Sequence, residues 1–308
     1  MKLASLGSLA LICSAASADE SASTGKVTAE FIGASGGLKI FPKSDANGFI
    51  MVQQSKLQEV DANGVAPGGT SISMAGQNTW TALATTQTEG KTVYSTTFSK
   101  TSGATSFELT AHLARETTTT IENVPCNNCT SATSGGCQNA ALACEAATDA
   151  ACTGDGYSLC TETVAVVADE LKFSIVVQGF PFKDPANKLQ YMLEIKDKTG
   201  AAGTVDAKDA PGAAKSKTVA MNGGHIDTPT TAVIKGGAAD ETVDVVVTAT
   251  EQGSKRQITF LFDSFAAGKA LYYDPTLIVE TSGASAVAAA SLFSVAALGL
   301  LTASVALY

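Results

Sequence analysis

The chain is 308 residues long and carries a net charge of −9 at pH 7, with two histidines. Its charges are scattered, and an acidic chain of this kind repels nucleic-acid phosphates, which excludes nucleic-acid binding. The composition is rich in Thr, Ala, Gly, Ser and Val, residue types that suit strands and the turns between them.

Met1–Ala18 has the pattern of a secretory signal. Lys2 precedes a short apolar core, and Ala16–Ala18 supplies small residues at the cleavage position. The core is too short to span a bilayer, which takes about 20 apolar residues. We therefore expect a signal peptide at 1–18 that is cleaved to leave Asp19 as the first mature residue.

The region 19–125 is predicted to be β-rich, because short runs of apolar residues alternate with period two between turn signals. Asp45–Gly48 and Asp61–Gly64 both end in Asn-Gly, a strong hairpin signal. The expected strands are Val27–Ile32, Leu38–Phe41, Phe49–Val60, Thr79–Leu83, Thr92–Phe98, Phe107–Leu113 and Thr117–Val124.

Two features of this region suggest chemistry at first sight. Gly33–Gly37 matches the G-x-S-x-G nucleophile elbow, but no helix follows it, so we interpret it as a Gly/Ser turn. His112 lies on the alternating run Phe107–Leu113, on the face opposite Phe107, Leu109 and Leu113. It has no neighbour at metal-ligand spacing, so we expect a surface histidine.

Residues 126–160 form a Cys-rich segment. Six of the seven cysteines lie there, and the seventh leaves with the signal; the six are Cys126, Cys129, Cys137, Cys144, Cys152 and Cys160. In an exported chain they predict three disulfides, with fifteen possible pairings. A zinc site or a redox pair at Cys126–Cys129 is the alternative, but neither has the second ligand pair or βαβ context that it needs. Asn128 begins the one N-glycosylation sequon of the mature chain.

The region 161–281 continues the β pattern. Its expected strands are Thr161–Val167, Leu171–Val177, Leu189–Ile195, Thr218–Met221, Thr231–Ile234, Val243–Ala249, Gln257–Phe262 and Leu271–Val279, with a loop at Gly200–Lys217. The fold class is therefore all-β: a β-sandwich or two packed antiparallel sheets with a disulfide-rich insertion, plus an N-terminal signal helix and a C-terminal apolar helix. A barrel is the alternative.

Several short motifs in Thr161–Glu280 carry a resemblance; they are Leu171–Ile175, Phe180–Phe182, Asn187–Gln190, Leu193–Ile195, Ile258–Phe260 and Tyr273–Pro275. In these motifs the chain resembles an uncharacterised family of secreted or cell-surface β-rich proteins of protists, algae and simple animals. The resemblance implies an extracellular β domain. It implies no activity and no site residues.

Residues 282–308 form a C-terminal apolar tail, in which Val287–Tyr308 is almost free of charge. Small residues before the run make Ser282 and Gly283 candidates for attachment of a GPI anchor. A transmembrane helix is the alternative, but no Lys or Arg follows the run, and a single-span protein usually has a basic cytoplasmic flank. We expect attachment to the membrane through this end.

The remaining polar and aromatic residues do not converge on a reaction. His225 follows Asn222-Gly-Gly224 and is expected in a turn, and Asp169-Glu170 and Asp240-Glu241 are adjacent carboxylates in expected turns. Phe180–Phe182 and Tyr272-Tyr273 could stack on a sugar or peptide, but packing at strand ends is the simpler interpretation.

We therefore expect a protein of the outer face of the plasma membrane that acts as a coat, adhesion or ligand-binding module, without catalysis or a cofactor. Its partners would be extracellular proteins or glycans. One alternative is a surface-tethered carbohydrate-active hydrolase that uses carboxylates from distant strands. Another is an assembly subunit that pairs through edge strands.

Overall fold

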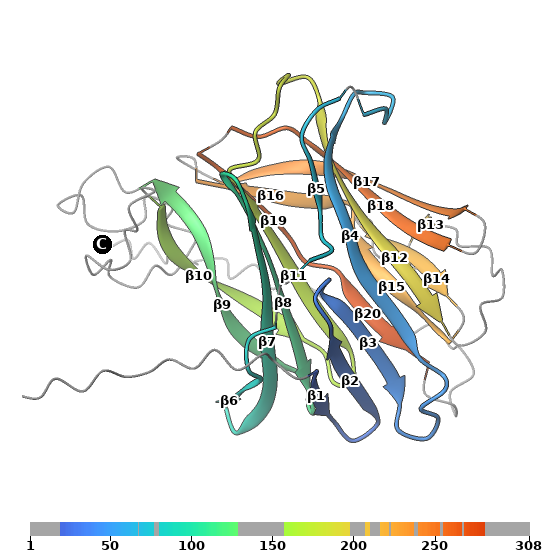
Figure 1. The fold of residues 1–308 in the computed structure, drawn as a ribbon. Coiled ribbons are helices and arrows are strands. Elements are labelled where there is room, and N and C mark those ends of the chain that lie inside the picture. Colours follow the sequence, from blue (N-terminus) through green and yellow to red (C-terminus); the bar gives the residue numbers. More distant parts are fainter. Residues whose placement is uncertain are drawn as a thin grey trace, which may run out of the picture.

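The computed structural model of the protein describes residues 19–66, 68–76, 80–128, 157–197, 207–209, 216–221, 223–236, 240–252, 255–266 and 268–280. Within these ranges the chain forms twenty strands and no helix, and none of it could cross a membrane as a helix. All strand pairings are antiparallel apart from one isolated bridge between Ala114 and Ala168. The predicted all-β class is confirmed (Figure 1).

The first sheet, sheet A, carries the N-terminal strands. From edge to edge its strands are β1 (Glu20–Ser23), β2 (Val27–Ile32), β3 (Gly37–Pro42), β4 (Ile50–Val60), β12 (Lys188–Asp197), β18 (Lys255–Asp263) and β17 (Glu241–Gln252). The short β5 (Ser71–Ser73) lies next to β3 along the same side of β4.

The second sheet, sheet B, packs against sheet A. Its first four strands, from the edge inward, are β6 (Ala84–Thr88), β7 (Lys91–Ser102), β8 (Thr105–Ala114) and β11 (Leu171–Gln178). The next position is shared by two short strands that lie end to end, β19 (Ala270–Tyr273) and β20 (Thr276–Val279). Beside β19 lies β16 (Thr231–Lys235), and beside β20 lie β15 (Gly224–Pro229), β14 (Ser216–Met221) and β13 (Ala207–Asp209) in that order. The first part of β17 pairs with β16 and the rest with β18, so this strand joins the two sheets.

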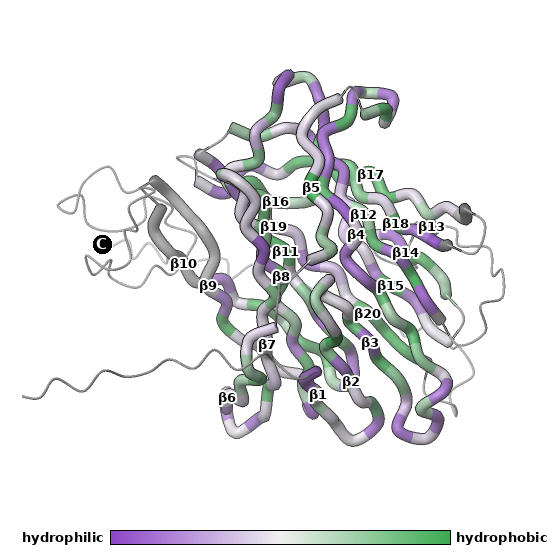
Figure 2. The backbone as a smooth tube through the Cα atoms, in the orientation of Figure 1, coloured by the Kyte–Doolittle hydropathy of each residue, from purple (hydrophilic) through white to green (hydrophobic). Residues whose placement is uncertain are grey.

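The core lies between the inner faces of the two sheets. Alternate residues point inward, and Figure 2 shows the alternation as changes of hydropathy along single strands. Aromatic rings from both sheets interlock there with centroids 5.2–6.4 Å apart. The rings belong to Phe31, Trp80, Phe98, Phe107, Tyr191, Phe260, Phe262 and Tyr273. Rings that touch across the two layers fix their relative position and make the fold a sandwich.

Most expected strands are confirmed, and the errors have identifiable causes. Of the expected strand Thr79–Leu83, the described residues 80–83 form no strand, since Trp80 makes only an isolated bridge to Phe98. Leu271–Val279 is split into two strands at Asp274-Pro275, because Pro lacks the N–H of a ladder. Strand β15 includes His225, which the sequence placed in a turn.

The interpretation of Gly33–Gly37 as a turn is confirmed, since it joins β2 to β3 with Gly33 and Gly36 in the left-handed region. In the expected loop Gly200–Lys217 the strand β13 was missed, and β14 begins at Ser216, two residues before the expected strand Thr218–Met221. β13 pairs with β14, and β14 pairs with β15. These strands are therefore held by pairing with their neighbours and not by a local apolar pattern.

A two-stranded ribbon leaves sheet B and returns to it. We use "ribbon" for β9 (Thr118–Asn128) and β10 (Tyr157–Val166), which pair antiparallel from Thr118–Val166 out to Asn128–Tyr157. The expected strands Thr117–Val124 and Thr161–Val167 thus pair as one hairpin, and residues 129–156 connect its two strands. Figure 1 shows the ribbon standing beside sheet B and extending past it.

A buried carboxylate fixes the loop between β11 and β12. Glu59 is fully buried and accepts hydrogen bonds from the backbone N–H groups of Lys183 (2.9 Å), Asp184 (3.1 Å) and Thr70 (3.3 Å) and from the Asn187 side chain (2.8 Å). Burial alone would raise the pKa of Glu59, but these donors lower it below its ordinary value.

We predict that Glu59→Ala lowers the free energy of unfolding by at least about 2 kcal/mol, because it leaves several buried donors without an acceptor. Urea denaturation followed by Trp80 fluorescence measures the change. Glu116→Ala, at an exposed position, is the control and is expected to be nearly neutral. Equal unfolding midpoints for the two variants would contradict the role of Glu59.

Candidate functional site

The outer face of sheet B carries a continuous row of polar residues. Strand register aligns one residue from each of six neighbouring strands; in order they are Ser95, His112, Lys172, Thr276, Asp227 and Thr218. They are outward-facing because their neighbours in sequence, such as Leu113 and Phe173, belong to the inner core. The ribbon covers the part of this face around His112.

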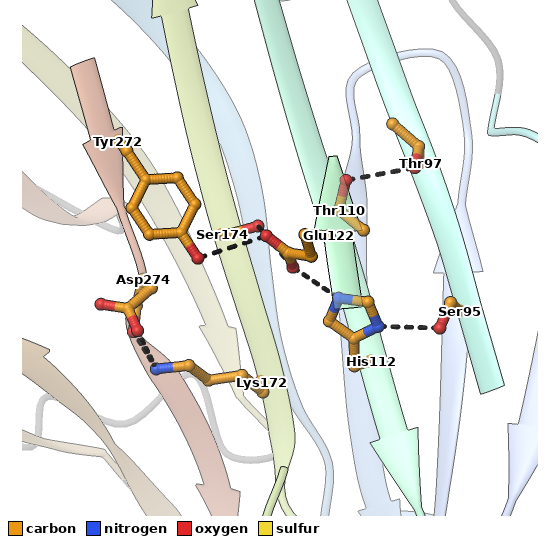
Figure 3. A network of polar contacts seen from close by, with 9 residues as sticks. All are labelled: Ser95, Thr97, Thr110, His112, Glu122, Lys172, Ser174, Tyr272 and Asp274. Atoms are coloured by element: carbon orange, nitrogen blue, oxygen red, sulfur yellow. Dashed lines mark hydrogen bonds and ion pairs between the residues drawn. The ribbon is translucent and has the colours of Figure 1, made fainter. Parts of the chain in front are cut away.

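His112 lies at the centre of the covered part (Figure 3). The predicted face is correct, but the predicted exposure is wrong, because only 2% of His112 is accessible. Its Nε2 lies 2.5 Å from Glu122 Oε1 of β9, and its Nδ1 lies 2.7 Å from the Ser95 hydroxyl of β7. Three strands therefore supply a serine, a histidine and a carboxylate in line.

Glu122 receives further donors from the sheet beneath it. The Ser174 hydroxyl is 2.8 Å and 2.7 Å from its two oxygens, and the Tyr272 hydroxyl donates to Oε2 at 3.2 Å (Figure 3). Only 6% of Glu122 is exposed. A buried carboxylate needs such donors to offset its lost hydration, and here every one of them comes from sheet B. Glu122 thus ties the ribbon to strands β8, β11 and β19.

A second ionic contact joins the ribbon to sheet B at the same level, because Glu162 is the cross-strand partner of Glu122. Lys235 of β16 is buried, and its Nζ lies 2.8 Å from Glu162 of β10 and 3.2 Å from Asp240. The same ammonium lies 5.4 Å from the centroid of the Tyr272 ring, within range of a cation–π contact. Lys235 therefore joins the second strand of the ribbon to the same tyrosine that contacts Glu122.

Apolar contact at the base of the ribbon is small. Val164 and Val166 of β10 pack with Val93 and Ala114 of sheet B. Polar contacts consequently carry much of the attachment and specify its register. Burial raises the pKa of Tyr272 far above its ordinary value, and the negative charge of Glu122 raises it further. The phenol is therefore a hydrogen-bond donor at any physiological pH.

The open part of the outer face is a mixed cluster of charges. Lys172 pairs with Asp274 at 2.8 Å, and His225 lies 3.8 Å from Asp227. Burial and the charge of Asp227 raise the pKa of Glu170 to about 7, although Lys172 opposes the shift. The adjacent Asp169 accepts a hydrogen bond from Thr24 at 2.5 Å, which fixes the turn before β11.

The residues singled out from the sequence have different outcomes. Cys126 and Cys160 lie on the two paired strands of the ribbon, where the backbone of Cys160 is opposite Val124. Cys129, Cys137, Cys144 and Cys152 lie outside the described residues, as do Ser282 and Gly283. Asn128 is the last described residue of β9. The disulfide, glycosylation and anchor assignments remain predictions.

Two pairs of aromatic residues are assigned to packing, as the sequence suggested. Phe180 contacts Phe182, which contacts Phe265, with centroids 4.9 Å and 5.5 Å apart. Tyr273 points into the core, whereas Tyr272 points outward beneath the ribbon.

Sequence reasoning missed Glu122, Ser174 and Lys235, and it considered Tyr272 only as an aromatic ring. The structure buries Thr118, Thr120 and Glu122 and exposes Ile121 between them, and no apolar alternation in this polar strand indicates which face is covered. In the described part of the chain no group of three or more His, Cys, Asp or Glu residues is arranged to hold a metal ion.

No protein-family model and no curated protein matches this chain. Its function therefore has to be inferred from the geometry of the site.

We predict that Glu122→Ala detaches the ribbon without unfolding the sandwich. The variant leaves Ser174, Tyr272 and His112 without their shared acceptor, while the aromatic core is untouched. Hydrogen–deuterium exchange should accelerate in peptides of β9 and β10 and stay unchanged in β4 and β12. Thr119→Ala, on the exposed face of the same strand, is the matched control. Uniformly faster exchange in the variant would instead mean that Glu122 supports the whole fold.

We predict that Glu170→Gln flattens the pH dependence of stability between about pH 4.5 and 7. Since the folded state raises the pKa of Glu170, it binds this proton more tightly than the unfolded chain, and stability falls as pH rises through this range. Denaturant unfolding at pH 5 and pH 8 measures the difference. Asp244→Asn, an exposed carboxylate, is the control, and a wild-type slope in Glu170→Gln would refute the assignment.

Proposed function

We propose that this protein is a membrane-anchored cell-surface module that holds a disulfide-rich segment away from the membrane, where the segment binds an extracellular protein or glycan. The protein would act as a coat, adhesion or ligand-binding component of the outer face of the plasma membrane. The observation that carries the proposal is the attachment of the ribbon to sheet B through Glu122 and Lys235. A segment inserted in a fixed ribbon is presented in one direction.

Strand register supports a direction that differs from that of the C-terminal tail. The base of the ribbon lies near Ala114 and Ala168, at the same end of β11 as its pairing with β20. Glu280 follows β20 and donates its backbone N–H to Gly223 at this end. Lys235, which Glu162 contacts, pairs with Ala270 at the other end. A tail that follows Glu280 and residues 129–156 would accordingly leave the sandwich in different directions.

The length of the ribbon also supports presentation of residues 129–156 away from the sheet. Beyond Glu122, which contacts sheet B, β9 continues for six more residues to Asn128. At about 3.3 Å per residue these extend roughly 20 Å farther. Residues 129–156 would begin there, well past the contact of Glu122 with sheet B.

Anchoring is tested on intact cells with a phosphatidylinositol-specific phospholipase. We expect the enzyme to release the protein into the medium, because Ser282 or Gly283 would carry a GPI anchor. A known GPI-anchored protein of the same cells serves as the positive control. Retention of this protein while the control is released would favour a transmembrane helix and reject the GPI assignment.

Presentation is tested with the soluble chain 19–281. In a matched variant, residues 129–156 are replaced by Asn-Gly, which suits a hairpin turn between the paired residues Asn128 and Tyr157. Labelled protein is applied to a glycan array and to cells of the same culture. We expect at least a tenfold loss of binding in the variant. Undiminished binding would show that the sandwich, not the Cys-rich segment, is the contact surface.

A further inference from the structure

We propose that Ser95 is a nucleophile, activated by His112 and Glu122, that takes acyl groups from small reactive esters. This activity goes beyond the display role and departs from the absence of catalysis that the sequence favours. It depends on neither the membrane anchor nor the Cys-rich segment.

The three side chains have the connectivity of an acyl-transfer triad. Ser95 Oγ is 2.7 Å from His112 Nδ1, and His112 Nε2 is 2.5 Å from Glu122 Oε1 (Figure 3). A nucleophile within hydrogen-bond reach of a base that is itself oriented by a third group is the recurring signature of an activated hydroxyl. Ser95 and His112 are direct cross-strand partners, so the sheet itself sets their separation.

Glu122 determines which nitrogen of His112 can act as the base. The carboxylate accepts at Nε2, so the neutral ring carries its proton on Nε2 and presents the Nδ1 lone pair to Ser95. Hydrogen bonds from Ser174 and Tyr272 keep Glu122 from turning away. Burial of His112 and Glu122 excludes water from the pair, which strengthens their interaction when the ring becomes positively charged.

The chemical step balances without a further reactant. Ser95 Oγ attacks the ester carbonyl carbon while its proton passes to His112 Nδ1, and Glu122 stabilises the imidazolium. The tetrahedral intermediate then expels the alkoxide, which takes the proton from Nδ1 and leaves as an alcohol. A water molecule attacks acyl-Ser95 by the same route, releases the carboxylic acid and restores the hydroxyl.

Access and electrostatics limit the substrate to small, reactive esters. Ser95 is half-buried, and its other neighbour across the sheet is the exposed Ala84 of edge strand β6. Ser95 pairs with β6 on one side and β8 on the other, so its strand offers no free backbone N–H to an oxyanion. An oxyanion-hole donor is worth about 10²–10³ in rate. Turnover is therefore slow, and covalent labelling of the serine is the sensitive readout.

The test uses the full chain, an alkyl fluorophosphonate probe and peptide mass spectrometry. We expect the probe to label Ser95 and expect Ser95→Ala to remove the label. Ser99→Ala is the matched control, because Ser99 lies on the same face of β7 but is exposed and opposite Glu108. His112→Gln, whose amide can still bond to both neighbours, should slow labelling at least tenfold. A chromogenic acetyl ester should give the same ranking.

Two results would overturn the proposal. The first is labelling of Ser95 no faster than labelling of Ser99. The second is an unchanged rate at Ser95 in a His112→Gln variant whose circular dichroism and ribbon exchange match the parent protein. Either result leaves release by the phospholipase and binding by the Cys-rich segment untouched, so failure here is distinguishable from failure of the display function.

Discussion

A carboxylate buried between two β layers has to receive hydrogen bonds, because the free energy of its lost hydration is otherwise several kcal/mol. In this protein that constraint applies at Glu122, which the ribbon carries down onto sheet B. Its donors are Ser174, Tyr272 and His112, from three neighbouring strands. The position of the ribbon and the orientation of His112 both depend on satisfying this one side chain.

The two faces of sheet B consequently have different physical roles. The inner face is apolar and interlocks with sheet A through aromatic rings, so it determines stability. The outer face is polar, and its contacts with the ribbon are directional rather than extensive. Polar contacts of this kind contribute less to stability than apolar burial, but they favour a single arrangement because each donor needs its own acceptor.

Much of the sandwich could be predicted from period-two alternation, since the apolar side of strands such as Val27–Ile32 and Phe107–Leu113 is buried in the core. Sequence also located the two strands that flank the Cys-rich segment. Strands held only by neighbours were missed: β6 consists of Ala, Thr and Gln with no apolar side to alternate. The run Leu271–Val279 was predicted as one strand, but Pro275 separates β19 from β20.

The site itself was less predictable, for a physical reason. His112 follows the alternation of its strand and was correctly placed on the outer face, but exposure depends on what covers that face. The cover is a ribbon that pairs with itself and reaches sheet B through side chains. Glu122 and Ser174 are 52 residues apart in the chain, and no local pattern reports a contact over that separation. Which carboxylates and hydroxyls come into contact is determined only by the register between strands.

Glu122 docks the ribbon on the outer face of sheet B through His112, Ser174 and Tyr272. The most direct measurement is a set of nuclear Overhauser effects in the soluble chain 19–281, between side-chain protons of Glu122 and those of His112, Ser174 and Tyr272. A docked ribbon gives all three sets together with cross-strand effects between β9 and β10. Cross-strand effects within the ribbon without any to sheet B would contradict this docking, because the ribbon would then be formed but not docked.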